Sequence, residues 1–358
     1  MRKFSKFLCF GLALSALFLA SCSSDDDGGQ PMPDDAVFQH GVFILNEGNF
    51  GAGNASVDFL STDGVVTHDI YSLINNEPLG DVAQSIYMDG DLAYIVLNGS
   101  AKIEIVNRYS FEKVGTVSTG LVNPRYMTIL NGMAYVTNWG DPTDPSDDFV
   151  AVINLSNFTV SSTITVSEGP EQIVSANNRI YVAHMGGWNF GNTISVINPG
   201  TNSVSSTIQT GDVPESLIAS NDFLYVLCSG KPDWSGEETV GSLIMFDTNT
   251  NMQLSTVPFA LGIHPTKLVT DGNMLYYTEA DIVKAVDMLD MNNSTTLFST
   301  SPQGVFGAYG LAVSNGKVYI GDAGDYTSDG RILIYSTTGN LIETHTAGLL
   351  PNNFGFNH

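Results

Sequence analysis

The sequence predicts an all-β protein, a seven-bladed β-propeller with four-stranded antiparallel blades, and internal repeats are the first observation that leads to this prediction. One unit recurs about every 45 residues. It consists of an aromatic residue inside an apolar, β-branched run, and a tight polar turn precedes most copies. The aromatic residues of the seven copies are Phe43, Tyr94, Tyr135, Tyr181, Tyr225, Tyr276 and Tyr319.

The second observation is that each repeat has room for further strands around that aromatic residue. Turns such as Asn131-Gly132 and Asn315-Gly316 suit two-residue hairpins, because Asn and Gly tolerate a positive φ. A third strand is expected in every repeat, and a fourth follows it, as at 162–166 and 206–210. The expected third strands are Val57–Leu60, Ile103–Asn107, Val150–Asn154, Ile194–Asn198, Leu243–Asp247, Val283–Asp287 and Ile332–Ser336.

The third observation concerns the ends of the chain. Before the first strand of most repeats stands Pro or Ala, then two variable residues and an apolar residue, as in Pro170-Glu171-Gln172-Ile173. The repeat that begins near Gly41 has no such strand of its own, but the motif occurs once more at the C-terminus, as Pro351-Asn352-Asn353-Phe354. We therefore expect residues 351–357 to supply the missing strand and close the ring, which removes the last open sheet edge.

The segment before the propeller is expected to be a signal peptide over 1–21 and an acidic flexible tether over 22–36, with the propeller over 37–358. Three basic residues precede an apolar stretch that is too short to span a bilayer. Leu19-Ala20-Ser21-Cys22 resembles the lipobox of bacterial lipoproteins, which implies that Cys22 is lipidated. The Ser/Asp run after Cys22 is similar to the surface-export signal of Bacteroidetes lipoproteins, which implies a lipid-anchored protein at the cell surface, on the outer membrane. A merely solvated acidic tether is the alternative.

Charge and cysteine content narrow the range of partners. The formal net charge of −24 argues against nucleic acid and against docking on anionic lipid by charge. Contact with the membrane is therefore expected through the lipid anchor only. Cys228 is the single cysteine of the propeller and lies in an apolar run, so we interpret it as a core residue rather than a nucleophile.

One face of the predicted propeller carries unusual side chains. In a propeller, the loops that join second and third strands open on the same face as the loops that join the blades. Here these loops are long and contain all three tryptophans of the chain. The first variable residues of the seven motifs would form a varied polar ring around the channel mouth, which suits an asymmetric ligand. The ring consists of Gln84, Arg125, Glu171, Glu215, Thr266, Tyr309 and Asn352. A hydrated mouth without a ligand, with each Trp folded over its own loop, is the alternative.

We predict a ligand-binding site on this face, with no catalytic residue, no metal and no cofactor, because the sequence contains none of the common catalytic motifs. The candidate ligand-binding residues are Phe50, Gln84, Arg125, Trp139, Glu171, His184, Trp188, Phe190, Glu215, Trp234, Tyr309, Tyr326 and Asn352.

Two metal-binding alternatives stay open at this point. A metal-dependent lyase or hydrolase would bring His184 and His264 together with Glu171 or Glu215. The acidic loop 141–148 holds four aspartates that could hold calcium, but it lacks Asp-x-Asp-x-Asp spacing, so a solvated loop is the preferred interpretation.

Tyr135-Val136-Thr137-Asn138 matches the signature of the YVTN-type propeller repeats, and nearly the whole chain after the tether resembles that YncE-like family. With the lipobox, the acidic tether and a start near Gly41-Val42-Phe43, the chain is similar to Bacteroidetes surface propellers that bind cobalamin. That resemblance implies cobalamin (vitamin B12) or a related corrinoid as a ligand rather than a cofactor, and a TonB-dependent outer-membrane transporter as the partner. A propeller that binds glycans or other proteins is the first alternative.

Overall fold

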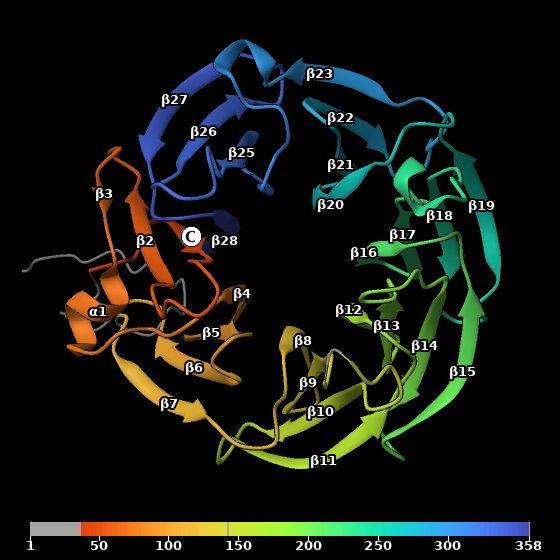
Figure 1. Cartoon of the computed structure of the whole chain (residues 1–358), viewed down its shortest axis with the longest axis horizontal. Helices are drawn as coiled ribbons and strands as arrows, with labels where there is room; N and C mark the ends of the chain where they lie inside the picture. Colours follow the sequence, from red (N-terminus) through yellow and green to blue (C-terminus); the bar gives the residue numbers. More distant parts are fainter. Residues whose placement is uncertain (1–36, 142, 358) are drawn as a thin grey trace, which may run out of the picture. The chain divides into compact units, whose positions relative to one another are not determined.

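A computed structural model describes residues 37–141 and 143–357, and its strands form seven four-stranded antiparallel sheets arranged in a ring (Figure 1). The prediction of a seven-bladed propeller is confirmed. The predicted signal peptide, the predicted tether and the predicted lipidation site at Cys22 lie outside the described residues. Within the described ranges, no helix is both long and apolar enough to cross a membrane.

Each blade runs from an inner to an outer strand. The first four blades in chain order consist of β28 (Pro351–Asn357), β1 (Gly41–Asn46), β2 (Ser56–Ser61) and β3 (Val66–Thr67); β4 (Ala83–Asp89), β5 (Leu92–Leu97), β6 (Lys102–Asn107) and β7 (Lys113–Val117); β8 (Pro124–Leu130), β9 (Met133–Asn138), β10 (Phe149–Asn154) and β11 (Thr159–Thr165); and β12 (Pro170–Ala176), β13 (Arg179–His184), β14 (Thr193–Asn198) and β15 (Ser203–Gln209).

The other three blades have the same order. They consist of β16 (Pro214–Ser220), β17 (Phe223–Cys228), β18 (Ser242–Asp247) and β19 (Gln253–Pro258); β20 (Thr266–Asp271), β21 (Met274–Glu279), β22 (Ile282–Asp287) and β23 (Thr295–Ser299); and β24 (Gly310–Ser314), β25 (Lys317–Asp322), β26 (Arg331–Ser336) and β27 (Leu341–Thr346). All seven predicted third strands are present. Helix α1 (Ile70–Asn75), which the repeats did not predict, precedes the second blade, and 3-10 turns cover Asp233–Ser235 and Ser301–Gln303.

The ring closes as predicted, because β28 pairs with β1 from the other end of the chain. Arg108, at the end of β6, reinforces this closure. Its guanidinium donates to the Asn357 side-chain oxygen at 2.5 Å and to the Phe356 carbonyl at 2.9 Å. The C-terminal strand is therefore bound both to its own blade and to the next one.

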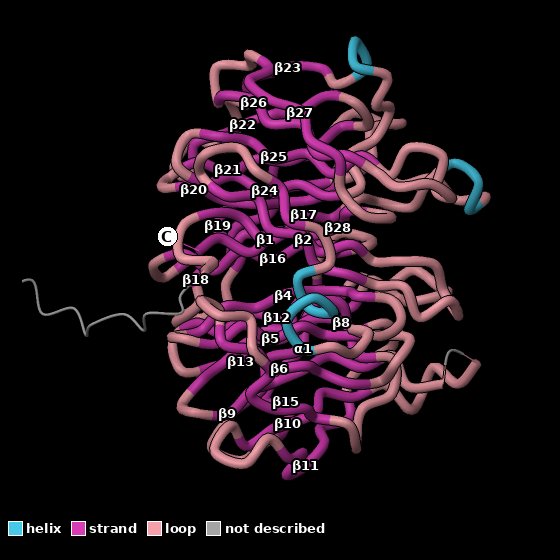
Figure 2. Tube along the Cα trace, turned by 90° about the vertical axis from the view of Figure 1, so that its left-hand side faces the viewer, coloured by secondary structure: helices cyan, strands magenta, loops and turns pink. Residues whose placement is uncertain are grey.

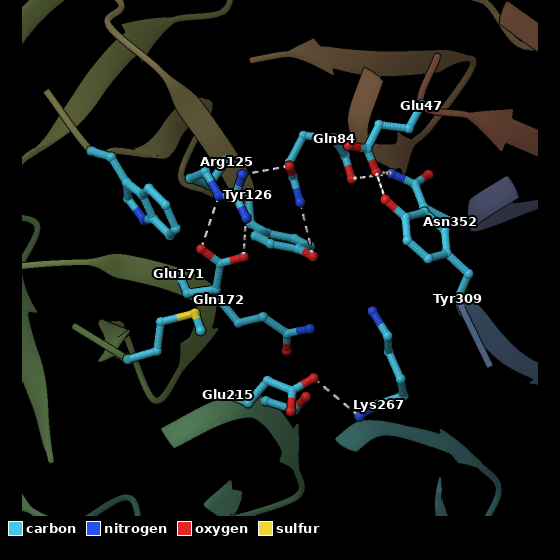
Figure 3. Close-up of a pocket in the computed structure, with 13 residues that line it drawn as sticks. Glu47, Gln84, Arg125, Tyr126, Glu171, Gln172, Glu215, Lys267, Tyr309 and Asn352 are labelled. Atoms are coloured by element: carbon cyan, nitrogen blue, oxygen red, sulfur yellow. Dashed lines mark hydrogen bonds and ion pairs between the residues drawn. The ribbon is translucent and has the colours of Figure 1, made fainter. Parts of the chain in front are cut away.

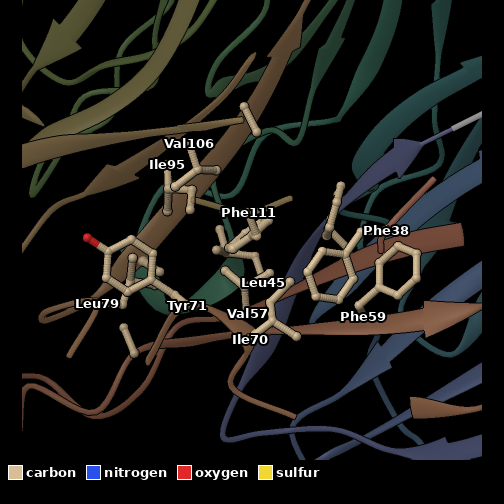
Figure 4. Packing of buried hydrophobic residues seen from close by; sticks show 14 of the residues in the cluster. Phe38, Leu45, Val57, Phe59, Ile70, Tyr71, Leu79, Ile95, Val106 and Phe111 are labelled. Atoms are coloured by element: carbon tan, nitrogen blue, oxygen red, sulfur yellow. The ribbon is translucent and has the colours of Figure 1, made fainter. Parts of the chain in front are cut away.

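The core lies between neighbouring blades, where the second and third strands are buried almost throughout. The largest apolar cluster joins the first two blades and contains Phe38, Phe59, Tyr71 and Phe111 (Figure 4). Cys228, at the end of β17, is fully buried as expected, and burial raises the pKa of its thiol to about 11. The Cys228 thiol is therefore uncharged at neutral pH and acts as a small core side chain.

The two faces of the ring differ in loop length. Turns between first and second strands have two residues, as at 131–132 and 221–222. Loops between second and third strands vary from two residues, at 280–281, to the long loops 139–148 and 229–241. The longer loops project from the right-hand side in Figure 2. We call this side, which also carries the loops between blades, the pocket face.

Candidate ligand-binding site

The central pocket opens on the pocket face, where the inner strands begin. In six of the seven blades the inner strand has a β-bulge one to three residues after its start, and only β24 pairs without a shift. A bulge bends the strand and re-aims the side chains at that position. These bulges place the variable residues of the repeat motif in the pocket.

The central pocket encloses about 310 Å³ and is lined mainly by charged and amide side chains (Figure 3). Six of the seven residues predicted for the polar ring line it. The exception is Thr266, whose neighbour Lys267 takes that place. The lining residues are Glu47, Gln84, Arg125, Tyr126, Trp139, Glu171, Gln172, Met185, Glu215, Ser216, Lys267, Tyr309 and Asn352.

Arg125 organises one side of the central pocket. Its guanidinium donates to both carboxylate oxygens of Glu171, at 2.7 and 2.9 Å, and to Gln84 Oε1 at 2.6 Å. It also lies 4.2 Å from the ring centroid of Trp139, whose indole N–H donates to the Pro170 carbonyl. A bidentate ion pair stacked on an aromatic ring is rigid. This wall is therefore preorganised.

Glu47 and Glu215 lie elsewhere in the central pocket. Glu47 accepts a hydrogen bond from the Tyr309 hydroxyl at 2.5 Å and a longer one from the Asn352 amide at 3.4 Å. Glu215 accepts from Ser229 Oγ at 2.9 Å and from the Lys267 backbone N–H at 3.2 Å, and burial raises the pKa of its carboxyl. The pocket thus mixes paired charges, a carboxyl that resists ionisation and several amides.

Sequence reasoning missed several lining residues. Tyr126, Gln172, Ser216 and Lys267 occupy the second variable position of the repeat motif, whereas the predicted polar ring contains only residues of the first position. The bulges explain the omission, because in a regular strand adjacent side chains point to opposite faces. The repeat motif itself would have identified all four. Glu47 follows β1, and no repeat signal marks it.

The aromatic candidates divide into two groups. Trp139 and Tyr309 line the central pocket. Phe50, Trp188, Trp234 and Tyr326 are 84, 77, 78 and 59% exposed on the surrounding loops of the pocket face. Phe190 contacts Trp234, with ring centroids 5.7 Å apart. We call these five outer residues the aromatic rim; their role as ligand contacts stays a prediction.

His184 is not at the predicted site. It ends β13, is 1% exposed, and its Nε2 lies 2.8 Å from Ser195 Oγ on the adjacent strand. Burial lowers its pKa to about 4. The sequence suggested a loop residue, but the strand runs one residue further into the blade. His264 contacts the Ser229 carbonyl and Glu238 instead.

The two histidines of the predicted metal site do not meet in the central pocket. Neither His184 nor His264 lines the central pocket. Across 37–141 and 143–357, no group of three or more His, Cys, Asp or Glu side chains is placed to hold a metal ion. In the acidic loop, Asp147 accepts from the Asp141 backbone N–H, and Asp148 from Gly169 N–H at 2.9 Å. Asp147 therefore binds the backbone of its own loop, and Asp148 binds the backbone just before β12.

Several solved structures share the fold at low sequence identity. Hydrazine synthase from Kuenenia stuttgartiensis is 17% identical over 76% of this chain and 88% of that chain, with a TM-score of 0.61. A quinoprotein alcohol dehydrogenase-like protein from Bacteroides thetaiotaomicron is 12% identical over 90% and 79%, with a TM-score of 0.65. BamB from Moraxella catarrhalis is 14% identical over 88% and 85%, with a TM-score of 0.52. Their varied functions show that the fold alone does not identify an activity.

Sequence comparison places the chain in a family. No curated protein matches it in sequence. A family model does match, over residues 40–315, which include most of the propeller. The chain belongs to the family described as Domain of unknown function (DUF5074).

Proposed function

We propose that this protein is a non-catalytic ligand-binding propeller that captures cobalamin or a related corrinoid at the cell surface and passes it to a TonB-dependent transporter. The observation that carries the binding role is the polar central pocket surrounded by the aromatic rim on one face of a rigid ring. Convergent polar groups inside an aromatic border are typical of small-molecule sites. The choice of a corrinoid rests on the family resemblance.

The size of the central pocket constrains how such a ligand would bind. Its volume of about 310 Å³ is at the small end for ligand pockets, which reach about 1,000 Å³. A corrin ring with its side chains is too large to enter. We therefore expect the ring to lie across the mouth, one polar arm to enter the pocket, and exposed side chains such as Trp188 and Trp234 to cover the ring edge.

Calorimetric titration of the full chain with cyanocobalamin tests this proposal, and we expect one-to-one binding. Replacing both Trp188 and Trp234 by Ala should weaken binding at least about tenfold, since aromatic contacts dominate such interfaces. Both side chains are mostly exposed, so the fold should survive. The matched control replaces Leu289 and Met252, which are 82 and 63% exposed in loops of the opposite face, by Ala and should leave affinity unchanged. No heat at micromolar concentrations would exclude the corrinoid.

A glycan is the second candidate ligand, and the exposed Phe190–Trp234 pair favours it, because sugars stack on such rings. The two ligands differ in one simple property. A corrinoid absorbs visible light, so a protein that has bound it is coloured after gel filtration, whereas a glycan complex is colourless. A colourless protein that is retained by immobilised glycans would favour the second candidate.

The surface location is also a proposal and depends on Cys22. A Cys22→Ala variant should lose its lipid and leave the membrane fraction, whereas a Cys9→Ala variant, changed inside the leader, should stay there. Protease added to intact cells should degrade the anchored protein if it faces outward. Full protection of the anchored protein would place it on the inner side of the outer membrane.

A further inference from the structure

Two hydrogen-bond donors in the central pocket have no protein acceptor among the described residues. Gln172 Oε1 accepts from the Leu217 backbone N–H at 2.9 Å. This bond fixes the orientation of the amide and leaves its NH₂ group for the pocket. The Lys267 backbone N–H donates to Glu215, but the Lys267 ammonium has no hydrogen bond or ion pair within 37–141 and 143–357. Figure 3 shows both nitrogen-bearing ends directed toward the middle of the pocket.

The backbone holds Lys267 in this position at a cost. Its φ is +63°, a left-handed conformation that disfavours a residue with a Cβ, and it lies in the bulge between Thr266 and Val269. Strain of this kind persists where the surrounding structure determines it, and it is concentrated at functional sites. Here the bulge turns a charged side chain toward the pocket instead of toward solvent.

Two free donors directed into one pocket require an acceptor oxygen from the ligand, and the charge of the lining residues decides which kind of oxygen is favoured. The lining residues include three carboxyl groups, Glu47, Glu171 and Glu215, against two cations, Arg125 and Lys267. Arg125 is neutralised by Glu171. An anionic ligand group would share the pocket with the Glu47 carboxylate, and Lys267 is the one lining cation that Glu171 does not already neutralise. A neutral carbonyl oxygen avoids this repulsion.

A neutral carbonyl with N–H groups fits the rest of the central pocket as well. Both bonds of Glu47 to Tyr309 and Asn352 use Oε2, and no described residue donates to Oε1, which can therefore accept an N–H from a ligand. A carboxamide provides both functions in one group, a carbonyl oxygen and two N–H donors. A carboxylate provides only acceptors.

We propose that the central pocket recognises a neutral carboxamide group, whose carbonyl oxygen binds between Lys267 Nζ and Gln172 Nε2. This inference rests on the proposed function in one respect, that the pocket binds a ligand. It adds the chemical class of the group that enters. Amide-rich ligands are selected, and their carboxylate analogues are rejected.

The test compares glutaramide with glutarate, which share a carbon chain but carry amides and carboxylates, respectively. Ligand-observed NMR titration of the full chain should show glutaramide binding at least tenfold tighter. Lys267→Met should lower glutaramide affinity at least tenfold, as expected for loss of a hydrogen bond to a charged donor. Lys284→Met is the matched control, because Lys284 lies in the same blade and pairs with Glu279 away from the pocket. It should bind like the unaltered chain.

A second variant keeps the test decisive if Lys267→Met does not fold. Gln172→Glu keeps the acceptor for the Leu217 N–H and removes the free donors, so it should also lose glutaramide. Equal binding of the two probes, including none of either, tighter binding of glutarate, or full affinity in both variants would overturn the inference. Neither probe contains a corrin ring, so the failure of cyanocobalamin to bind would refute the proposed ligand and leave this result intact.

Discussion

The two faces of the propeller are built from the same repeats but carry different kinds of loop. On the face opposite the pocket, two-residue turns such as 131–132, 221–222 and 315–316 join the first and second strands, and Asn or Gly adopts a positive φ in them. On the pocket face, the loops after the second strands run from 47 to 55 in one blade and from 229 to 241 in another. They differ in length, sequence and charge.

This difference between the loops shows at which positions of the repeat the choice of amino acid is restricted. A two-residue hairpin demands particular backbone angles, so its residues are restricted to Asn, Asp and Gly. The pocket-face loops need only leave one strand and enter the next. Even so, some are held firmly; Asp81, for example, accepts backbone N–H bonds from Gly51 and Gly53 and fixes the loop that presents Phe50. The pocket face can therefore vary in sequence and still keep its side chains in place.

The pocket face carries a buried ion pair, Arg125–Glu171, and an exposed one, Lys231–Glu237. Breaking the buried pair should cause the largest loss of unfolding free energy. Arg125→Met leaves the buried Glu171 carboxylate without its partner, which should cost about 3–5 kcal/mol of unfolding free energy. Denaturant unfolding measures this. Lys231→Met breaks a pair with Glu237, which is 83% exposed, and should cost no more than about 1 kcal/mol. The double variant Arg125→Met/Glu171→Met should recover most of the loss. Similar costs for the two single variants would contradict a preorganised pocket wall.

Two aspartates in loops of the pocket face, Asp148 and Asp325, should affect stability differently as the pH changes. Burial raises the pKa of Asp148 to about 7 from an ordinary value of 3.8, so the folded state holds this proton more tightly than the unfolded state. The contribution of this carboxyl to stability should therefore be greatest below about pH 4 and should be lost as pH rises to about 7. Asp148→Asn keeps an acceptor for the Gly169 N–H and removes the titration.

Unfolding free energies of the unaltered chain and Asp148→Asn, measured from pH 4 to pH 8, check this prediction. The variant should become the more stable of the two as pH rises. Asp325→Asn is the control, because backbone N–H groups of Thr327 and Ser328 lower the pKa of Asp325 to about 2. Its difference from the unaltered chain should stay constant above pH 5. Parallel curves for Asp148→Asn would show that this carboxyl ionises freely in the folded protein.

The fold was predicted well from the sequence because all seven blades form the same kind of four-stranded sheet and therefore share one residue pattern. Periodic aromatics such as Tyr135 and Tyr181 mark second strands, and positive-φ turns mark hairpins, so the pattern is averaged over seven copies. Closure by 351–357 followed from one unpaired motif. Helix α1 occurs once, its start set by the Asp69 side chain that accepts from Ser72 N–H, and a single feature gives no periodic signal.

The pocket was predicted only in part, because register shifts cannot be read from residue types. The ring position expected for Thr266 belongs to Lys267, and the bulge that exchanges them involves backbone angles that lysine does not favour. The position of His184 was not predicted for a related reason. A residue at the end of a strand can point into the blade or out of it, and His184 points into the blade. The family resemblance could not supply these details, because it carries no residue-level motif for the site.

The smallest expected effect on stability comes from a substitution in a turn of the face opposite the pocket. Asn221 lies in the turn between β16 and β17 with φ of +53°. Asn221→Ala should cost about 1 kcal/mol of unfolding free energy, because an alanine Cβ is disfavoured in the left-handed region, whereas Asn221→Gly should cost close to nothing. Both variants should bind ligands as the unaltered chain does, since the change lies far from the pocket-face loops. A loss of affinity in Asn221→Ala without a loss of stability would show that the two faces are coupled through the blade, and that the repeat does not separate folding from binding.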